Sequence, residues 1–591
     1  METMRLTCTR RGVGEKIYAP NAIGNGDLSL LVDYRGSTAP ATYGRHGVTG
    51  IWRAGIRHNR PGWDLVSFGW WEHVVPGAGE LADWSQTLHV TEAATSTETV
   101  YAGGAAVSTF AYCLLDCNLV VLRVRVTGAE TFRMHYHFEP ERTAIVPLDD
   151  CRTAYQIDTV RQPRGTVAFL CRDEGVRLTR TRGDVWYDCP AGEHVFYLAF
   201  DAEAERLAAQ GDEASCWRRQ QEAWGAYWAE STLPADRLPP QVLRAARTSE
   251  YHLRVSSTRW SIPTGIYPPH WQGRYFAFDE FYCLGGLLAA GHDSTARKIP
   301  EFRRSHLSAA RFRAYHYFKT DGPAARFVWE TLEEPGVEGA PGGFWIEHIF
   351  HEANIALGAW QCYEHDPDRA FLEETAYPLI RACAEFFRIF YVEEREGGRI
   401  IIGRCTDLER LGAARENPFM TTCGAIATFR AAAQAAAILG CDDDLARIWA
   451  DTAEQLRRWL PKNPEGTAYI PYPGCPDQSI ALLSGLYPYP CLPPDDPCQR
   501  AGIEAFVATE SQFGNMYPVG KSLCTWYAGW KALAFCRLGE RDIAKTVIAQ
   551  MCDDTGCFSE VFEICEGGYH PWFTTGEGTL LQAICEAYAS D

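Results

Sequence analysis

Long apolar runs and positive charge are both scarce in this sequence of 591 residues. The opening METMRLTCTRRGVGEK holds no apolar segment of signal-peptide length, and no later run approaches the roughly 20 apolar residues of a membrane span. The 56 Lys and Arg are outnumbered by 75 Asp and Glu, which leaves a formal charge of −19. Nucleic acids and anionic membranes are bound through concentrated Lys and Arg, so we expect neither as a partner. We also expect the protein to remain in the cytoplasm.

Recognisable metal and nucleotide motifs are missing as well. The 22 cysteines are scattered, and no close pair is joined to a second Cys or His couple at zinc-finger spacing. His348 and His351 stand three residues apart in EHIFHEAN, but this is not a His-Glu-x-x-His motif. GNGD lacks the Gly-Lys-Ser/Thr of a phosphate loop. We therefore predict reduced thiols, no metal site and no cofactor.

The period of the apolar residues changes near residue 200, and this change divides the chain. Before it, LVVLRVRVTG, FRMHYHFEP, TVAFLCRD and HVFYLAF alternate or run apolar over strand lengths. Residues 1–200 are thus predicted to form an antiparallel β-sandwich domain. Residues 201–240 are predicted to contain a linker helix, because their apolar residues recur at helical spacing up to the LPADRLPP break.

Residues 241–591 carry a succession of amphipathic helical patterns, among them YPLIRACAEFFRIFYV and DLARIWADTAEQLRRWL. Long loops rich in Trp, Tyr, His, Asp and Glu separate them, which is unlike the short polar turns of a simple bundle. In an (α/α)6 barrel such loops gather at one end and form a pocket. Aromatic rings there would cover the apolar faces of a sugar, and carboxylates would bind its hydroxyls. We expect a multidomain β + α chain, a β-sandwich followed by this barrel.

Several loop motifs resemble glycoside hydrolase family 65 and its clan, collinearly over most of the chain. NAIGNGDLSLLVD resembles the Gly-Asn-Gly turn of that family's sandwich domain. YFAFDEFYCLGGLLAAGH is similar to its Phe-Trp-Asp-x-Glu barrel motif, around Phe278, Asp279 and Glu280. The resemblance implies a sandwich, a linker helix and a helical barrel in that order, and an enzyme acting on α-linked glucose.

The segment TDLERLGAARENPFMTT resembles the family's segment that bears the catalytic acid. The resemblance places Glu409 on that acid and Asn417 on the following loop Asn. The family's usual Tyr-His after the acid is Arg410-Leu411 here, and Asp407 is the reserve candidate for the acid.

Two later loops also resemble the family. GKSLCTWYAGWKALAFCRLGERDIA is similar to the Ser-Ser-Leu-Ser loop that helps to bind phosphate in the family's phosphorylases, with Lys521 and Cys524 in place of two serines. GGYHPWFTTGEGTLLQAI is similar to the segment before the last barrel helix and places Glu577 at the mouth of the barrel. In hydrolases of the wider clan a carboxylate in this region serves as the base.

Inverting hydrolysis needs one carboxyl group that protonates the leaving oxygen and a second that deprotonates water on the opposite face of the sugar, about 6.5 to 9.5 Å away. We predict Glu409 as the acid and Glu577 as the base. Single Trp residues are more often core residues, yet the Trp residues proposed for the site lie in or beside Gly- and Pro-containing loop sequence. Asp279 and Glu280 could instead stabilise a helix N-terminus or pair with Arg274, because acidic residues favour helix N-termini. The residues predicted to bind substrate are Trp271, Arg274, Asp279, Glu280, Trp329, Glu330, Trp345, His348, Asn417, Lys521, His570 and Trp572.

Two other functions compete with hydrolysis of an α-linked glucoside. An inverting disaccharide phosphorylase of the same fold would use phosphate in place of activated water, and the incomplete serine loop disfavours it. A non-catalytic carbohydrate-binding protein would need the aromatic pocket but no matched acid and base. The expected partner is an oligosaccharide or small glycoside, and a homodimer is compatible with the sequence.

Overall fold

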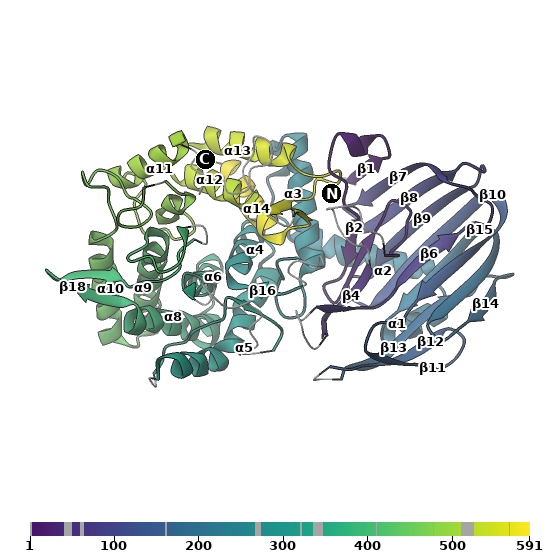
Figure 1. Cartoon of the computed structure of the whole chain (residues 1–591), viewed down its shortest axis with the longest axis horizontal. Coiled ribbons are helices and arrows are strands. Elements are labelled where there is room, and N and C mark those ends of the chain that lie inside the picture. Colours follow the sequence, from purple (N-terminus) through teal and green to yellow (C-terminus); the bar gives the residue numbers. More distant parts are fainter. Residues whose placement is uncertain are drawn as a thin grey trace.

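The structure is a computed structural model, and it shows an antiparallel β-sheet domain followed by a helical domain (Figure 1). This arrangement confirms the predicted fold class. The residues described are 3–40, 50–58, 64–159, 162–265, 273–319, 322–334, 347–408, 411–476, 478–509, 525–565 and 568–590.

Two antiparallel sheets make up the first domain. The larger has 11 strands in the order β1-β7-β8-β9-β10-β15-β13-β12-β11, with β14 beside β15 and β6 beside β10. The smaller has 4 strands in the order β2-β3-β4-β5. The strands of the larger sheet are β1 (Arg5–Thr9), β6 (Trp70–Val74), β7 (Leu81–His89), β8 (Ala94–Tyr101), β9 (Ala106–Cys113), β10 (Leu119–His137), β11 (Thr143–Pro147), β12 (Arg152–Ile157), β13 (Arg164–Cys171), β14 (Arg177–Arg180) and β15 (Asp184–Ala199). Those of the smaller are β2 (Asn21–Gly24), β3 (Leu28–Val32), β4 (Gly50–Arg57) and β5 (Leu65–Ser67).

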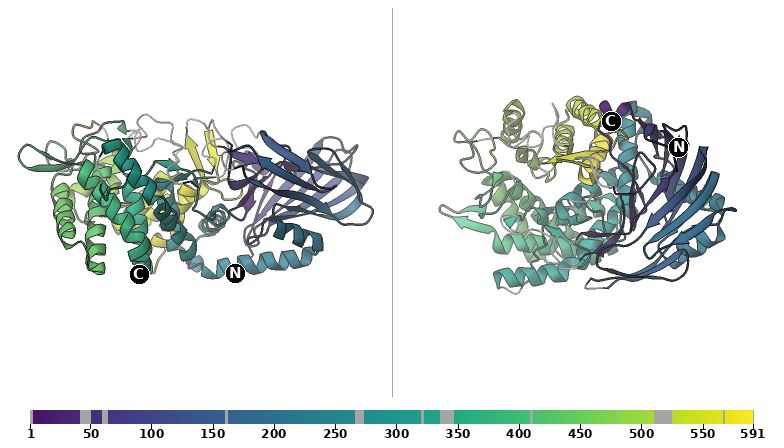
Figure 2. Two further views of the ribbon diagram at one scale, coloured as in Figure 1. Left: turned by 90° about the horizontal axis from the view of Figure 1, so that it is seen from below. Right: turned by 45° about the vertical axis from the view of Figure 1, so that its right-hand side comes forward.

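Alternation along β10 explains how the sheets pack. Met134 and Tyr136 belong to the core that both sheets share with residues such as Leu30, whereas His135 and His137 point to the opposite, outer face. Near the other end of β10, Val121 on this outer face packs under helices α1 (Ala202–Gln210) and α2 (Glu213–Glu230). These helices run along one side of the molecule in Figure 2.

The prediction of one linker helix over this region is wrong. Gly211, at φ 67°, ends α1 in the left-handed conformation, and the Asp212 side chain accepts a hydrogen bond from the Ser215 N–H and begins α2. A glycine followed by a capping aspartate thus divides the segment into two helices.

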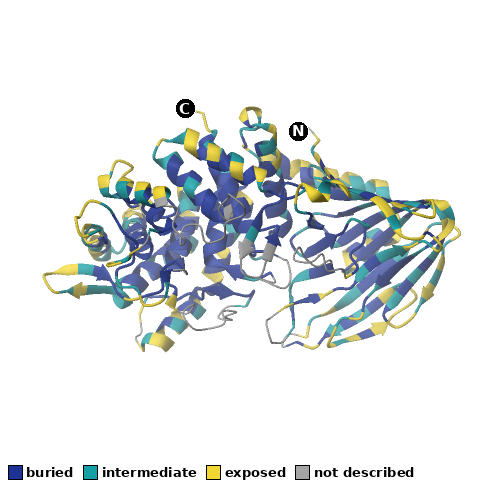
Figure 3. Cartoon of the chain, turned by 45° about the horizontal axis from the view of Figure 1, so that its top comes forward, coloured by how far each residue is buried: buried dark blue, intermediate teal, exposed yellow. Residues whose placement is uncertain are grey.

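Helices in the second domain form an inner and an outer ring, and Figure 3 shows how deeply the inner helices are buried. Inner elements α4, α6, α9, η6, α12 and α14 contact one another in that order, and α14 returns to α4, which closes the ring. The outer helices are α3, α5, α8, α10, α11 and α13. The bounds are α3 (Pro240–Ser256), α4 (Ala277–Ala289), α5 (Asp293–Phe318), α6 (His351–His365), α8 (Tyr377–Phe390), α9 (Phe419–Leu439), α10 (Asp443–Arg458), η6 (Ile480–Gly485), α11 (Pro497–Thr509), α12 (Thr525–Arg537), α13 (Arg541–Asp553) and α14 (Thr574–Ala587).

Helix α9 is long and apolar enough, by length and composition, to cross a membrane, although no such run was expected from the sequence. Of its most apolar window 67% is buried inside the fold. As an inner element of the ring, α9 is covered by its neighbours, and this position accounts for its composition.

The two domains meet along a polar and aromatic seam. Arg57 of β4 forms a buried ion pair with Glu333 of the helical domain, with Nη2 and Oε1 2.8 Å apart. The Tyr251 hydroxyl of α3 donates to the Ala22 carbonyl at 2.6 Å. Gly26 lies so close to α3 that a Cβ there would be 1.9 Å from the Ser257 oxygen, and its φ is +92°. The Gly-Asn-Gly turn therefore docks the sheets onto the barrel.

Candidate active site

The N-termini of the inner helices converge at one end of the barrel. Phe278 in the first turn of α4 contacts Phe350 before α6 and Trp526 in α12, with ring centroids 5.6 and 5.3 Å apart. The Thr575 hydroxyl at the start of α14 donates to Asp279 of α4. The loops before these helices therefore meet at the same end of the barrel, and helix N-termini there favour negative charge.

Glu577 occupies the first turn of α14, and both its side chain and that of His252 are fully buried. The Nδ1–H of His252 donates to Glu577 Oε2 at 2.6 Å, and the Ser256 hydroxyl is hydrogen-bonded to Nε2 of His252 at 3.1 Å. Within the described residues, Glu577 Oε1 is buried without a hydrogen-bond partner. Burial raises the pKa of Glu577, and the His252 N–H and charge oppose that rise. One oxygen is thus held while the other stays available to accept a proton.

Asp407 stands two residues before Glu409 and is fully buried. Its Oδ1 accepts hydrogen bonds from the Thr421 N–H, at 2.9 Å, and from the Thr421 hydroxyl, which links it to the first turn of α9. Burial raises the pKa of Asp407 to about 6, against the hydrogen bonds from Thr421. This carboxyl group therefore caps α9 and also has a pKa suited to proton transfer near neutral pH.

Aromatic side chains line the same end of the barrel. Trp329 contacts Phe278 and His348, with ring centroids 6.1 and 4.5 Å apart. Burial lowers the pKa of His348 well below its ordinary value, so the ring is neutral at physiological pH. A backbone bridge pairs His348 with Thr406, next to Asp407. Trp329 and His348 are thus brought together with the segment that contains Asp407.

Arg274 and Glu330 form an ion pair beside this aromatic group. Arg274 directly precedes β16 (Tyr275–Phe276), which pairs antiparallel with β17 (Glu330–Thr331), and Arg274 Nη1 is 2.9 Å from Glu330 Oε1. The two side chains are 16% and 5% exposed, so the pair is largely withdrawn from solvent. Buried ion pairs hold loops in one geometry, and this one joins the loops before α4 and α6.

His570 lies in β21 (Gly568–Pro571), opposite Glu563 of β20 (Phe562–Cys565), and is buried just before α14. Four predicted site residues lie outside the described part of the chain: Glu409, Trp271, Trp345 and Lys521. Their assignment stays a prediction.

Glu280 has structural partners, and its predicted contact with substrate stays a prediction. Its side chain is 1% exposed, and Ser261 and Arg303 occupy both carboxylate oxygens, with Arg303 Nε 2.6 Å from Oε2. This ion pair joins α4 to α5. Asp279, 8% exposed and bonded to Thr575 of α14, is the acidic residue of the motif that faces the neighbouring inner helix.

Asn417 and Trp572 likewise have structural partners, and their predicted contacts with substrate stay predictions. The Asn417 amide donates to the Trp459 carbonyl at 2.8 Å and so fixes the turn before α9. Trp572 is 1% exposed, donates to the Pro20 carbonyl at 2.9 Å and packs with Tyr251 in the domain seam. The Asn417 amide nitrogen and the Trp572 indole N–H each donate to a backbone carbonyl, which gives both residues a structural role.

His252 is the residue of this site that the sequence patterns do not predict. It is 325 residues from Glu577 and lies in α3, whose amphipathic pattern marks it as an ordinary outer helix. No spacing rule links the two positions, so only the fold reveals the pair.

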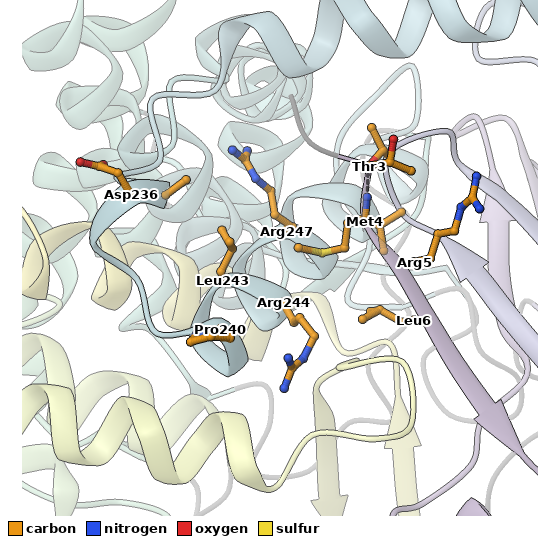
Figure 4. A pocket seen from close by; sticks show the side chains of 12 residues that line it. Thr3, Met4, Arg5, Leu6, Asp236, Pro240, Leu243, Arg244 and Arg247 are labelled. Atoms are coloured by element: carbon orange, nitrogen blue, oxygen red, sulfur yellow. Dashed lines mark hydrogen bonds between the residues drawn. The ribbon is translucent and has the colours of Figure 1, made fainter.

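A separate pocket of about 480 Å³ opens between β1 and the N-terminal half of α3 (Figure 4). Met4, Leu243, Arg244 and Arg247 are among its lining residues. None of the predicted site residues lines it, so it is distinct from the barrel end. Among the described residues, groups spaced to hold a metal ion lie in the sheet domain and not at this site.

Comparisons with known proteins show that the chain is similar to glycoside hydrolases. Residues 313–468 match the model of the glycosyl hydrolase family 95 catalytic domain. The chain is 26% identical over 401 residues to a kojibiose hydrolase of Mucilaginibacter mallensis. The aligned region covers 65% of this chain and 55% of that protein. A kojibiose hydrolase of Flavobacterium johnsoniae is 26% identical over 397 residues, with the same coverage. The chain thus spans about half the length of these relatives.

Solved structures share the whole fold. A bacterial glucoamylase in complex with acarbose matches 99% of this chain and 98% of its own with a TM-score of 0.65 at 10% identity. A putative kojibiose phosphorylase from the human microbiome matches 99% of this chain and 88% of its own with a TM-score of 0.66 at 11% identity. At these identities the likeness concerns the fold, which is the predicted sheet domain followed by an (α/α)6 barrel.

Proposed function

We propose that this chain, a family 65-like member of the glycoside hydrolase clan built on an (α/α)6 barrel, hydrolyses an α-linked glucoside with inversion of configuration. The observation that carries the proposal is the fully buried Glu577, with one oxygen held by His252 and the other without a partner among the described residues. A non-catalytic sugar-binding module would have no need of such a carboxylate.

Glu577 serves as the general base. Its unpartnered Oε1 takes a proton from water, while Oε2 remains bonded to the His252 N–H. The base must be ionised before it can act, and His252 favours the ionised form by lowering the pKa that burial raises. His252 thus offsets part of the cost that burial places on the charged form of Glu577.

Glu409 serves as the general acid and protonates the leaving glycosidic oxygen. Asp407, whose pKa burial raises to about 6, lies two residues away and is the reserve for this role. Its bond to the Thr421 N–H ties the acid-bearing segment to α9. A carboxyl group so anchored fixes the position of this segment, and it holds its proton up to about pH 6.

The substrate is a disaccharide or small glycoside whose non-reducing residue is α-linked glucose. The two kojibiose hydrolases among the relatives make kojibiose the first substrate to test. Trp329, Phe278 and His348 supply the flat faces against which a pyranose ring stacks, and Asp279 supplies hydroxyl acceptors beside them.

Product analysis of purified protein with kojibiose and other α-linked glucose disaccharides, with and without phosphate, tests the function. Hydrolysis predicts release of glucose at the same rate in both conditions. Loss of release in Glu409→Gln and Glu577→Gln, with both variants folded by circular dichroism, would support the assigned acid and base. Release unchanged in Glu577→Gln would overturn the assignment of the base.

A phosphorylase is the second candidate, because the putative kojibiose phosphorylase shares the fold over 99% of this chain. Such an enzyme needs no base to activate water, and phosphate itself attacks the sugar. Glucose 1-phosphate formed only in the presence of phosphate would establish this activity and would remove Glu577 from the role of base.

A further inference from the structure

Two histidines and two carboxylates meet on the outer face of the large sheet, far along the chain from the barrel. His135 and His137 are two residues apart on β10, so both rings lie on the same face. In the register of the sheet, Glu72 of β6 and Trp186 of β15 flank His135, and Trp70 and Asp184 flank His137. Three neighbouring strands thus deliver these side chains to one place.

The imidazoles share a single carboxylate oxygen. Nε2 of His135 and Nδ1 of His137 each lie 2.8 Å from Asp184 Oδ1. These three ligand atoms lie within 4.8 Å of one another. His135 is 4% exposed, whereas the side chains of His137 and Asp184 are 30% and 31% exposed. The group is therefore buried on one side and open to solvent on the other.

His135 and Asp184 each have a second partner that fixes the orientation of the side chain. Nδ1 of His135 lies 3.3 Å from Glu72 Oε1, on the opposite side of the ring from Asp184. The Thr181 hydroxyl donates to Asp184 Oδ2 at 2.8 Å. The Trp186 ring stacks on His135 with centroids 3.6 Å apart and an angle of 4°. A carboxylate behind a ligating histidine is the arrangement that surrounds metal ions in proteins, because it sets the tautomer and strengthens the ligand.

We propose that His135 Nε2, His137 Nδ1 and Asp184 Oδ1 bind a divalent transition-metal ion of the zinc type, oriented by Glu72. Two imidazole nitrogens and one carboxylate oxygen suit Zn²⁺, and water completes the coordination from the exposed side. The ion replaces the protons that His135 and His137 now donate to Asp184, and these protons pass to solvent. The ion would clamp β10 to β15 at this end of the sheet.

A second group on the same sheet provides the matched control. Cys171, Asp173 and His194 are equally close in space. Their atoms are already committed, because His194 Nε2 lies 3.1 Å from the Pro190 carbonyl and Asp173 Oδ2 accepts from the Val195 N–H at 2.9 Å. Burial also raises the pKa of the Cys171 thiol to about 12, which disfavours the thiolate that a metal requires.

The test uses the full chain, stripped with a chelator and titrated with Zn²⁺ by calorimetry and with Co²⁺ by absorption. We expect one ion per chain with the weak visible bands of nitrogen and oxygen ligands. His137→Asn and Asp184→Asn should abolish this binding, Glu72→Gln should weaken it about 10-fold, and His194→Asn should leave it unchanged. Circular dichroism would confirm that the variants fold.

Three results would overturn the site: no binding by the wild type, equal binding by His137→Asn, or loss of binding in His194→Asn. Intense thiolate-to-cobalt absorption would also do so, since it would assign the ion to cysteines. Unlike an activity assay, these readouts do not depend on the function proposed for the barrel.

Discussion

The barrel end and the outer sheet face each pair a histidine with a carboxylate, but the pKa of the carboxyl group is raised at the barrel end and lowered on the sheet face. His252 donates to Glu577 at 2.6 Å with both side chains 0% exposed, and burial raises the Glu577 pKa. His135 donates to Asp184 at 2.8 Å, where Asp184 is 31% exposed. Partial burial alone would raise the pKa of Asp184, yet hydrogen bonds from His137, His135 and Thr181 lower it to about 2.

Burial and the number of donors account for the difference. One imidazole does not fully offset the loss of water around the completely buried Glu577, whereas two imidazoles and a hydroxyl prevail at Asp184, where water still reaches the carboxylate. The barrel end therefore keeps a group that exchanges protons, and the sheet face keeps a fixed negative charge next to imidazole nitrogens. Proton transfer and cation binding are the respective chemistries that these settings favour.

The largest expected effect comes from Glu577→Gln, which removes the base but keeps the shape. We expect kcat to fall by about 10² to 10⁴-fold, the usual contribution of general base catalysis. Glu352→Gln is the matched control, since Glu352 is also a fully buried glutamate in the first turn of an inner helix, α6. Steady-state kinetics on kojibiose would measure both. Equal losses in the two variants would contradict a specific role for Glu577.

His252→Phe sharpens the comparison by removing the donor from the buried pair. Because His252 lowers the Glu577 pKa, its loss should move the acidic limb of the pH–rate profile to higher pH and reduce kcat by up to about 100-fold. His252→Asn, whose amide nitrogen can replace Nδ1, should recover part of the rate. A profile lowered uniformly, with its acidic limb unmoved, would show that His252 only supports the fold.

Glu352 tests the effect of burial on stability. Burial raises its pKa from 4.5 to about 8, despite hydrogen bonds from the Phe327 N–H and the Cys383 thiol. In the unfolded chain Glu352 ionises near 4.5, so folding is penalised increasingly from about pH 4.5 to about pH 8, by at most about 1.4 kcal/mol per pH unit. Denaturant unfolding across this window should show the wild type losing stability relative to Glu352→Gln as pH rises. If the difference in unfolding free energy between the wild type and Glu352→Gln does not change with pH, the pKa of Glu352 is not raised in the folded protein.

The smallest effect, with the opposite sign, is expected for Asp184. Its pKa is lowered from 3.8 to about 2, so the stability it contributes is present above about pH 4 and is lost as pH falls toward 2. Asp184→Asn should therefore cost about 1 kcal/mol at neutral pH in metal-free protein, and less in acid. Denaturant unfolding of the two proteins measures this. If the difference in their free energies of unfolding is as large at low pH as at neutral pH, the pKa of Asp184 is not lowered and does not contrast with that of Glu577.

The alternation of strands and the helical periods were enough to predict the order of domains, because both are local patterns. Helix α5 was not predicted, since Pro300 interrupts its pattern. The split between α1 and α2 was missed although Gly211 and Asp212 signal it. Local sequence thus predicts the elements better than their ends.

Site residues were predictable where a loop motif carries the chemistry, as in Glu577. The partner of that residue was not, since His252 is distant in the sequence and lies in an ordinary amphipathic helix. Glu280 and Trp572 show the converse. Both belong to motif segments, and yet their polar atoms bond to Arg303 and to the Pro20 carbonyl. Burial and partners, which decide these cases, follow from the tertiary fold.

The central claim is that the barrel hydrolyses an α-linked glucoside with Glu577 delivering water to the opposite face of the sugar. Proton NMR of the anomeric signals during the first minutes of kojibiose hydrolysis tests it most directly. The account predicts that β-glucose appears first from the cleaved residue and that Glu577→Gln abolishes this signal. The appearance of α-glucose first would show retention and contradict it.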